Sequence, residues 1–420
     1  MAGSADWNWE TAEKKTDLSG WSDHYNWVEE FYASPDGEHI AAIVNVDEGE
    51  FTVCVDGQAW ENSFDKIWHL RYLADGRLTA IVSDSGEWTM AVDGTAWENR
   101  FGYIWNPIFS ADGKSIAVAA QQDMRYCMVL NDAPWDQDFS NMTYFALSPG
   151  GDATAAAVQT KEADSGEIHK FQEGVFTAAL NGRPWDATFV NVWNVVISPD
   201  GQHLAAEIRL NLYDYTIALD GKPWNKVYSC VWEPVFHPAG GKVTAPVRRA
   251  GKWYMACDDE IIWPGGFVQL WHQQYSHDGS HLAAIAAPKY GRWTVAVDGV
   301  PWSATFSDLV TDLVFSPDGQ RVAALAKEGA QWKVVVDGQP WSPVFDMAYA
   351  PVFSRDGRHV AAKVQKEGKY TVAVNGRLWS RACDRVWDPV FNSQGDKVLI
   401  RSIENGLFFR RIVPVQSISS

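Results

Sequence analysis

The 420-residue sequence has few cysteines and lacks the short motifs that hold most catalytic groups and cofactors. It contains no Cys-x-x-Cys pair, which disfavours a zinc ribbon, an attached c-type haem and a disulfide framework. A glycine-rich phosphate loop, a Gly-x-Ser-x-Gly elbow and a His-Glu-x-x-His pair are also missing. We therefore expect no catalytic residue, no metal site and no bound cofactor. The five cysteines are Cys54, Cys127, Cys230, Cys257 and Cys383.

Positive charge and long hydrophobic runs are scarce as well. Asp and Glu number 53 against 35 Lys and Arg, and the resulting net charge of −18 predicts repulsion from nucleic acid and from anionic lipid headgroups. No stretch reaches the roughly twenty apolar residues that a membrane helix needs. The first ten residues have neither a basic start nor an apolar run, so we expect no signal peptide. These absences predict a cytoplasmic protein with no direct membrane span and no nucleic-acid partner.

A repeated pair of turns is what the sequence does contain. The clearest copy runs from Leu313 to Phe345, where Asp318-Gly319 and Asp337-Gly338 separate short runs of β-branched residues. Asp-Gly between such runs is a strong signal for a β-hairpin, because glycine adopts positive φ without steric cost. Four short strands within about forty residues match one blade of a β-propeller.

The first turn of this unit recurs ten times along the chain. Its glycines are 37 to 40 residues apart, except between Gly151 and Gly201, and they are Gly37, Gly76, Gly113, Gly151, Gly201, Gly240, Gly279, Gly319, Gly357 and Gly395. The period predicts an all-β fold, a β-propeller of about ten four-stranded blades. Propellers typically have about four to eight blades, so two five-bladed propellers remain the alternative, with a boundary in the irregular sixth unit.

Aromatic residues follow the second turn at a spacing of four, as in Trp60, Phe64 and Trp68. This spacing places them on one face of a fourth strand, although it also suits a helix. Prolines just before the tryptophan, such as Pro184 and Pro223, favour the strand. We interpret most of the 23 tryptophans as structural contacts between successive blades.

The two ends of the chain complement each other. Gly20-Trp21, with Tyr25 four residues later, copies the aromatic fourth strand without the three strands before it, whereas the chain ends with three strands and no fourth. We expect the amino-terminal strand to complete the last blade, so that no sheet edge stays open. The predicted division is an N-terminal extension at residues 1–17, the propeller at 18–415 and a C-terminal tail at 416–420.

Few polar residues stand out from the repeat. Four histidines, His39, His203, His281 and His359, lie two places after a first-turn glycine, which indicates a shared structural position; His69 and His272 follow repeat tryptophans and are interpreted in the same way. Arg248-Arg249 and Arg410-Arg411 are expected to be surface pairs. Residues 161–174 lengthen the fourth unit, either as part of a binding face or as a solvated hairpin tip.

Two motifs resemble known families. Ser-Pro-Asp-Gly, as at residues 34–37 and 316–319, resembles the propeller repeats of the Tol-system periplasmic protein and of prolyl oligopeptidases. The pattern Asp-Gly-x-x-Trp-x-x-x-Phe-x-x-x-Trp, as at residues 56–68 and 93–105, resembles the tryptophan-repeat subunit of the transmembrane redox complex of sulfate-reducing bacteria. The propeller resemblance covers about residues 20–413.

The second resemblance implies a non-catalytic subunit of a membrane-associated electron-transfer complex that serves sulfate respiration. Such a subunit would carry no cofactor and would dock cytochrome and iron–sulfur subunits on the cytoplasmic side, peripheral to the inner membrane. Two other hypotheses stay open from the residues: an enzyme with its site in the central channel, and a sensor that binds a small ligand there. The sequence shows no cluster of titratable residues that would mark such a site.

Overall fold

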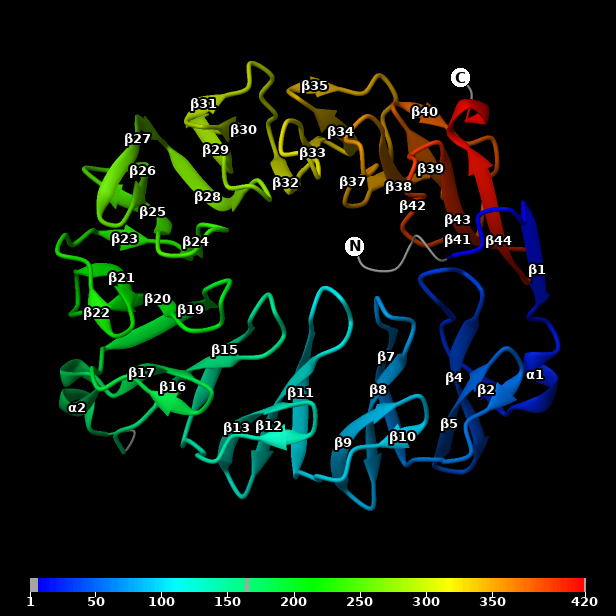
Figure 1. The fold of residues 1–420 in the computed structure, drawn as a ribbon, viewed down its shortest axis with the longest axis horizontal. Coiled ribbons are helices and arrows are strands. Elements are labelled where there is room, and N and C mark those ends of the chain that lie inside the picture. The colour runs from blue at the N-terminus through cyan, green and yellow to red at the C-terminus, as the bar shows by residue number, and fades with distance from the viewer. Residues whose placement is uncertain (1–6, 163–165, 419–420) are drawn as a thin grey trace. The chain divides into compact units, whose positions relative to one another are not determined.

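The computed structural model describes residues 7–162 and 166–418, and β-strands make up nearly all of its secondary structure (Figure 1). Ten antiparallel sheets follow one another along the chain, each with the strand order of a propeller blade. In four of them the first strand is divided into two short segments. The predicted fold class, an all-β propeller of ten four-stranded blades, is confirmed.

The first five blades contain the following strands. Blade 1 has β2 (Trp27–Val28), β3 (Tyr32–Ala33), β4 (Ile40–Asp47), β5 (Glu50–Val55) and β6 (Gln58–Ala59), and blade 2 has β7 (Lys66–Tyr72), β8 (Leu78–Asp84), β9 (Glu87–Val92) and β10 (Thr95–Ala96). Blade 3 has β11 (Tyr103–Phe109), β12 (Ile116–Gln122), β13 (Arg125–Leu130) and β14 (Ala133–Pro134). Blade 4 has β15 (Met142–Leu147), β16 (Thr154–Gln159), β17 (Phe176–Leu180) and β18 (Arg183–Pro184), and blade 5 has β19 (Asn191–Ile197), β20 (Leu204–Arg209), β21 (Tyr215–Leu219) and β22 (Lys222–Pro223).

The other five blades continue the pattern. Blade 6 has β23 (Cys230–Val231), β24 (Val235–Phe236), β25 (Val243–Arg249), β26 (Lys252–Cys257) and β27 (Glu260–Phe267), and blade 7 has β28 (Gln269–Tyr275), β29 (Leu282–Lys289), β30 (Arg292–Val297) and β31 (Val300–Pro301). Blade 8 has β32 (Leu309–Phe315), β33 (Val322–Glu328), β34 (Gln331–Val336) and β35 (Gln339–Pro340). Blade 9 has β36 (Met347–Ala348), β37 (Val352–Phe353), β38 (Val360–Lys366), β39 (Lys369–Val374) and β40 (Arg377–Leu378). Blade 10 has β41 (Arg385–Val386), β42 (Val390–Phe391), β43 (Lys397–Glu404), β44 (Leu407–Pro414) and β1 (Glu13–Asp17).

Helices are short and few within the described ranges. They are α1 (Trp21–His24), α2 (Ile168–Glu173) and the 3-10 turn η2 (Val415–Ser417). No helix of the described residues is long and apolar enough to cross a membrane. By its contacts the chain divides into two compact units, residues 1–78 with 274–420 and residues 79–273. Blades 3 to 6 lie wholly in the second unit, and both ends of the chain lie in the first.

The turns form as the glycine spacing predicts. At the second turn of blade 1, Asp56 and Gly57 have φ of 51° and 86°, the left-handed pair that a tight two-residue hairpin requires. The second strand, β4, is apolar on both faces, and Ile40 to Val44 are at most 3% exposed. Such a strand packs on both sides, because other strands cover its edges and neighbouring structure covers its faces.

The prediction that the repeat aromatics share one fourth strand is wrong, because the fourth strand is much shorter than expected. In blade 1 that strand is only β6, and Trp60 lies just after it. Phe64 forms an isolated bridge with Phe51, with backbone hydrogen bonds of 2.8 Å in both directions. Trp68 belongs to β7, the first strand of the next blade. The spacing of four therefore spans the connection between two blades rather than one strand.

The predicted packing role of the tryptophans is confirmed at four positions. A methyl group added at Gly182, in the second turn of blade 4, would lie 3.1 Å from Cβ of Trp135 in blade 3. Trp135 also donates a hydrogen bond of 2.8 Å from Nε1 to Oγ1 of Thr154. The same close contact joins Gly221 to Trp185, Gly338 to Trp302 and Gly376 to Trp341. Each tryptophan thus covers the turn of the following blade.

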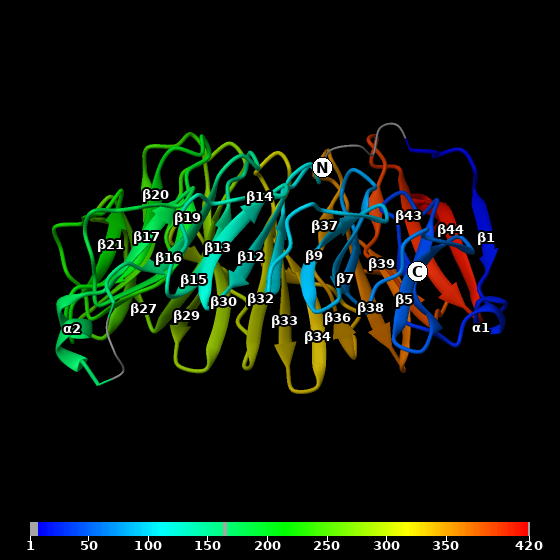
Figure 2. The same ribbon diagram turned by 90° about the horizontal axis from the view of Figure 1, so that it is seen from below.

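The predicted closure of the last blade by the amino-terminal part of the chain is confirmed, but the strand that closes it is Glu13–Asp17 and not the predicted segment that starts at Gly20. β1 pairs antiparallel with β44 over Glu13 to Asp17, and the two strands lie side by side in Figure 1 and Figure 2. The closing strand precedes the predicted Gly20-Trp21 segment, which forms helix α1 instead. Trp21 is 6% exposed and packs at this corner, so it stabilises the closure without being part of the strand.

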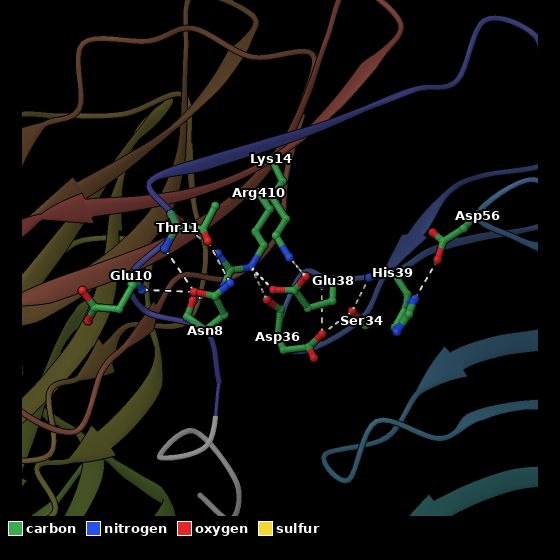
Figure 3. Close-up of polar contacts among 10 residues, drawn as sticks. All are labelled: Asn8, Glu10, Thr11, Lys14, Ser34, Asp36, Glu38, His39, Asp56 and Arg410. Atoms are coloured by element: carbon green, nitrogen blue, oxygen red, sulfur yellow. Dashed lines mark hydrogen bonds and ion pairs between the residues drawn. The ribbon is translucent and has the colours of Figure 1, made fainter.

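Buried arginines hold the closing segment, so the prediction that Arg410-Arg411 is a surface pair is wrong. Arg410 is 1% exposed; its Nε lies 2.9 Å from both the Asp36 carbonyl and the Glu38 carboxylate (Figure 3). The carbonyls of Asn8 and Thr11 accept hydrogen bonds from the same guanidinium. β44 lies between β43 and β1, and the amino-terminal segment covers side chains that would otherwise reach solvent.

Candidate functional site

The four repeat histidines share one structural position, as predicted. Nδ1 of His39, His203 and His281 lies 2.6 to 2.7 Å from the second-turn carboxylate of Asp56, Asp220 and Asp298, respectively (Figure 3 shows the first pair). His359 makes the equivalent contact with Asn375. The aspartate hydrogen bond raises the pKa of His203. These histidines join the two turns of a blade and do not form a site.

The residue after the repeat aromatic of the first strand adopts a left-handed conformation in several blades. φ is 55° at His69, 47° at Asn194 and 49° at His272. Asn, Asp and His tolerate this region better than other residues with a side chain. In blade 5 the ladder with β20 shifts register between Trp193 and Val196, so Asn194 stands in a β-bulge. Bulges of this kind redirect a side chain away from the regular alternation.

Glu207 is a buried carboxyl of the second unit whose pKa is strongly raised. It lies in β20, is 6% exposed, and accepts a hydrogen bond of 2.9 Å at Oε2 from Asn194 Nδ2. Burial raises the pKa of this carboxyl to about 7; the Asn194 hydrogen bond opposes the rise, and the charge of Glu233 adds to it. A buried carboxyl with this pKa changes its protonation near neutral pH.

Glu233 connects Glu207 to a histidine of the next blade. Its Oε1 accepts a hydrogen bond of 3.1 Å from the backbone N–H of His272 and lies 3.5 Å from Nδ1 of that imidazole. Its carbonyl oxygen accepts a hydrogen bond of 2.5 Å from Gln273 Nε2. Glu233 thus contacts His272, and its charge acts on the carboxyl of Glu207; we call these three residues the Glu207 cluster. His272 thus does more than occupy a repeat position.

The sequence carries a signal for Glu207 that motif searching misses. The residue six places after a first-turn glycine is apolar in most blades, as at Ile43, Ile285 and Leu325. Glu207 occupies this position in blade 5, Lys363 in blade 9 and Arg401 in blade 10. A charge at a position that the repeat keeps apolar marks a departure from purely structural use.

The Glu207 cluster has the chemistry of proton binding rather than of metal binding. Among the described residues, no group of three or more His, Cys, Asp or Glu side chains has the geometry to hold a metal ion. A carboxyl that titrates near neutral pH under the influence of a second carboxylate can accept or release a proton. The cluster is therefore suited to acid–base chemistry or to binding a cationic group.

A second candidate site is a group of exposed and partly exposed large side chains on blade 3. Tyr103, Trp105, Met124 and Tyr126, which we call the aromatic patch, line a cavity of about 610 Å³ with Gln121. Tyr103 stacks on Trp105 at 6.0 Å between ring centroids, and Trp105 meets Tyr126 edge-on at the same distance. Met124 is 73% exposed and Tyr103 is 40% exposed. The patch therefore presents apolar and aromatic surface to solvent.

The insertion at residues 161–174 lies partly outside the described residues, which omit 163–165. Its carboxyl end forms helix α2, and Ile168 is 63% exposed. Lys161 anchors the other end, because its Nζ donates hydrogen bonds of 3.2 and 2.8 Å to the Gly174 carbonyl and to Thr188 Oγ1. Both ends of the insertion are thus tied to blade 4.

No protein-family model and no curated protein matches the chain. Among solved structures, the chain is similar to a eukaryotic initiation factor, with 10% identity, 78% of this chain and 89% of that chain covered, and a TM-score of 0.46. It is also similar to the Dos1 propeller, with 11% identity, 95% and 94% covered, and a TM-score of 0.36. A putative TolB from Agrobacterium tumefaciens matches 50% of this chain and 81% of that one, with 14% identity and a TM-score of 0.31. These values are too low to carry an argument about function, and the fold assignment rests on the strand topology.

Proposed function

We propose that the protein is a non-catalytic docking subunit of a membrane-associated electron-transfer complex, and that it binds a redox partner through the aromatic patch. The proposal rests on the exposure of Tyr103 and Met124 around one cavity that the partly buried Trp105 also lines. Tyr, Trp and Met are enriched at the cores of protein interfaces, and tryptophan and tyrosine supply most hot spots.

The local backbone presents the patch in a fixed shape. Met124 lies in a two-residue turn with Asp123, and φ is 52° at Asp123 and 63° at Met124. Gln122 accepts a hydrogen bond of 2.7 Å at Oε1 from the backbone N–H of Gly102, which joins the turn to the segment before β11. Surface that is already ordered loses less conformational entropy when a partner binds.

The partner is expected to be a cytochrome or iron–sulfur subunit with a basic docking face. The net charge of −18 favours such a face electrostatically and speeds the approach of the partner. The repeat pattern at residues 56–68 and 93–105, similar to a redox-complex subunit, supports a role in sulfate respiration. In this proposal the protein is cytoplasmic, carries no cofactor and reaches the inner membrane only through its partners.

Affinity purification of the tagged protein from gently solubilised native membranes tests this proposal. We expect co-purified cytochrome and iron–sulfur subunits, seen by mass spectrometry and by haem absorption. Tyr103→Ser combined with Met124→Ser should reduce their recovery at least about tenfold, since hot-spot truncations each cost about 2 kcal/mol or more. Tyr213→Ser is the matched control, because Tyr213 is 78% exposed and lies outside the patch.

A purified protein without haem bands and without redox subunits would contradict the proposed complex. Equal recovery with the patch variant and with the Tyr213 variant would leave the complex intact but would exclude the patch as its docking surface.

The Glu207 cluster favours a second candidate function, an enzyme or a small-ligand sensor that uses acid–base chemistry. If this alternative holds, Glu207→Gln removes activity or ligand binding while the recovery of redox subunits stays unchanged. A Glu207→Gln protein that keeps every measured activity would exclude it.

A further inference from the structure

The hairpin between β25 and β26 carries positive charge that nothing on the described chain neutralises. Arg249 and Lys252 are directly opposite each other across the hairpin, so their side chains lie on the same face of blade 6. Neither forms an ion pair with any described residue. Like charges at opposite positions repel each other, and this pair persists in a chain whose net charge is −18.

Three other blades have a cation at the position of Lys252, the first residue of the third strand, and in each of them this cation has a side-chain partner. In blade 3, Arg125 Nε pairs with Asp138 at 2.9 Å, and in blade 7 Arg292 Nε donates to Thr305 at 2.9 Å. Both partners come just before the aromatic residue that bridges the third strand. In blade 6 that aromatic is Phe267, and the residue before it is Gly266. The usual partner side chain is therefore missing.

Gly266 also lets the side chains of Lys252 and Tyr254 lie directly against its backbone. A methyl group added there would lie 2.8 Å from Cδ of Lys252 and 3.0 Å from the hydroxyl of Tyr254. β27 is eight residues long, whereas the fourth strand of the other blades that the chain forms locally has two. The longer strand and the glycine together give blade 6 a different surface at this face.

A cavity of about 670 Å³ opens next to Arg249. Its walls are Lys226, Val227, Tyr228, Arg249, Tyr254, Glu260, Ile261 and Pro264. Glu260 offsets the charge of Lys226, because its Oε1 lies 2.6 Å from Lys226 Nζ. The hydroxyl of Tyr228 donates to Asp259 Oδ1 at 3.2 Å. The cavity thus combines apolar walls at Val227, Ile261 and Pro264 with one uncompensated guanidinium.

We propose that this cavity binds a phosphate monoester, with the organic group against Val227 and Ile261 and the phosphate at the Arg249 edge. Lys252 does not line the cavity, but it lies opposite Arg249 across the hairpin and adds its charge at that edge. A phosphate dianion matches two neighbouring cations, and guanidinium groups bind phosphate with two parallel hydrogen bonds. The volume exceeds what a phosphate needs and falls in the range of small-molecule sites. Nothing in this inference depends on the aromatic patch or on a redox partner.

Titration of the full-length protein with phenyl phosphate, followed by calorimetry, tests the site. We expect saturable binding that weakens as salt is added, since the attraction between the charges is screened. Arg249→Gln and Lys252→Ala should each weaken the affinity about tenfold or more, the loss of one charge-assisted hydrogen bond. Phenol, which lacks the phosphate, should not bind.

Lys369→Ala is the matched control. Lys369 also begins a third strand and also lies opposite a lysine, Lys366, but Asp384 neutralises it at 2.6 Å. Its removal should leave the phenyl phosphate affinity unchanged within about twofold. Gly266→Asp supplies the acid that blade 3 has at this position and should abolish binding. Melting temperatures of all variants establish that they are folded.

Absence of saturable binding to the wild-type protein would overturn the proposal. Equal losses from Lys252→Ala and Lys369→Ala would also overturn it, because they would show a response to total charge rather than to this cavity. Unchanged affinity in a folded Gly266→Asp protein would place the anion elsewhere.

Discussion

Glu207 and Arg401 occupy the same position in blades 5 and 10, six residues after the first-turn glycine, yet their surroundings differ. Arg401 is 7% exposed and donates hydrogen bonds of 2.8 and 2.6 Å to the carbonyls of Ser34 and Asp388. Burial lowers its pKa to about 10, and Asp388 and Asp36 oppose this fall, so it stays charged at neutral pH. Glu207 has one amide donor and a carboxylate neighbour, and it is half protonated near pH 7.

The contrast between Arg401 and Glu207 distinguishes a buried charge that stabilises the fold from one that does not. Arg401 links blade 10 to blade 1, where the chain closes, through the hydrogen bonds of its two terminal nitrogens; its buried Nε has no hydrogen-bond partner. Glu207 joins no two blades through hydrogen bonds of this kind, and its burial keeps the carboxyl protonated to a higher pH than usual. Buried ionisable groups without full compensation cluster at functional sites. The repeat thus provides an internal reference: the same position is structural in one blade and a candidate site in another.

The largest expected effect comes from removing Arg401, the charge that links two blades. Arg401→Ala leaves two buried carbonyls without their donor and opens a cavity, so we expect the free energy of unfolding to fall by about 4 kcal/mol. Thermal unfolding followed by circular dichroism measures this loss as a lower melting temperature. Arg248→Ala is the control, because an exposed arginine should change stability by less than about 0.5 kcal/mol. Equal melting temperatures for the two variants would show that Arg401 does not stabilise the fold.

The second effect concerns the uncompensated charge and depends on pH. The pKa of Glu207 is raised from 4.5 to about 7 in the folded protein, so its contribution to stability is complete below pH 4.5 and is lost as pH rises through 7. Glu207→Gln should match the wild type near pH 4.5 and exceed it at pH 8 by at most about 3 kcal/mol. Denaturant unfolding at both pH values measures the difference. Stability curves that run parallel across this range would show that Glu207 is not held protonated.

The sequence was sufficient for the fold because the determinants of the blades are local. Left-handed glycines at Gly57, Gly182 and their equivalents fix the hairpins, and the apolar second strands fix the packing. The aromatic spacing predicted the wrong strand, because Phe64 and Trp68 lie on either side of a blade boundary, and the period of the repeat does not show where that boundary falls.

The sites needed the three-dimensional structure because their partners are distant in sequence. Arg410 is buried by Asn8 and Thr11, about four hundred residues away, which no local pattern indicates. The charge that acts on Glu207 comes from Glu233 in the next unit of the repeat, and Glu233 in turn contacts His272 one unit further on. Lys252 faces Gly266, where blades 3 and 7 carry Asp138 and Thr305. Comparison of equivalent positions across blades is the signal that could have found them.

Two turn glycines at equivalent positions are expected to differ in how much stability an alanine costs, because only one of them packs against a tryptophan. Gly182 and Gly57 both occupy the second turn at positive φ, but only Gly182 contacts a tryptophan, Trp135. Gly57→Ala should cost about 1 kcal/mol from backbone strain alone. Gly182→Ala should cost about 1 kcal/mol more, because its methyl group would lie 3.1 Å from the Trp135 Cβ. Equal losses of melting temperature would mean that the tryptophan contact yields without cost.

The smallest expected effect concerns two surface lysines at equivalent positions. Replacing Lys369 should lower the free energy of unfolding, whereas replacing Lys252 should raise it. Lys369→Ala removes an exposed ion pair with Asp384 and should lower stability by about 0.5 kcal/mol. Lys252→Ala removes a charge that has no counter-charge and that lies opposite Arg249, so stability should rise by a few tenths of a kcal/mol, roughly the value of a cross-strand pair. Denaturant unfolding at low ionic strength resolves the difference best, because salt screens both terms. If both variants lose stability equally, a partner on the protein offsets the charge of Lys252, and that charge is not available for an anionic ligand.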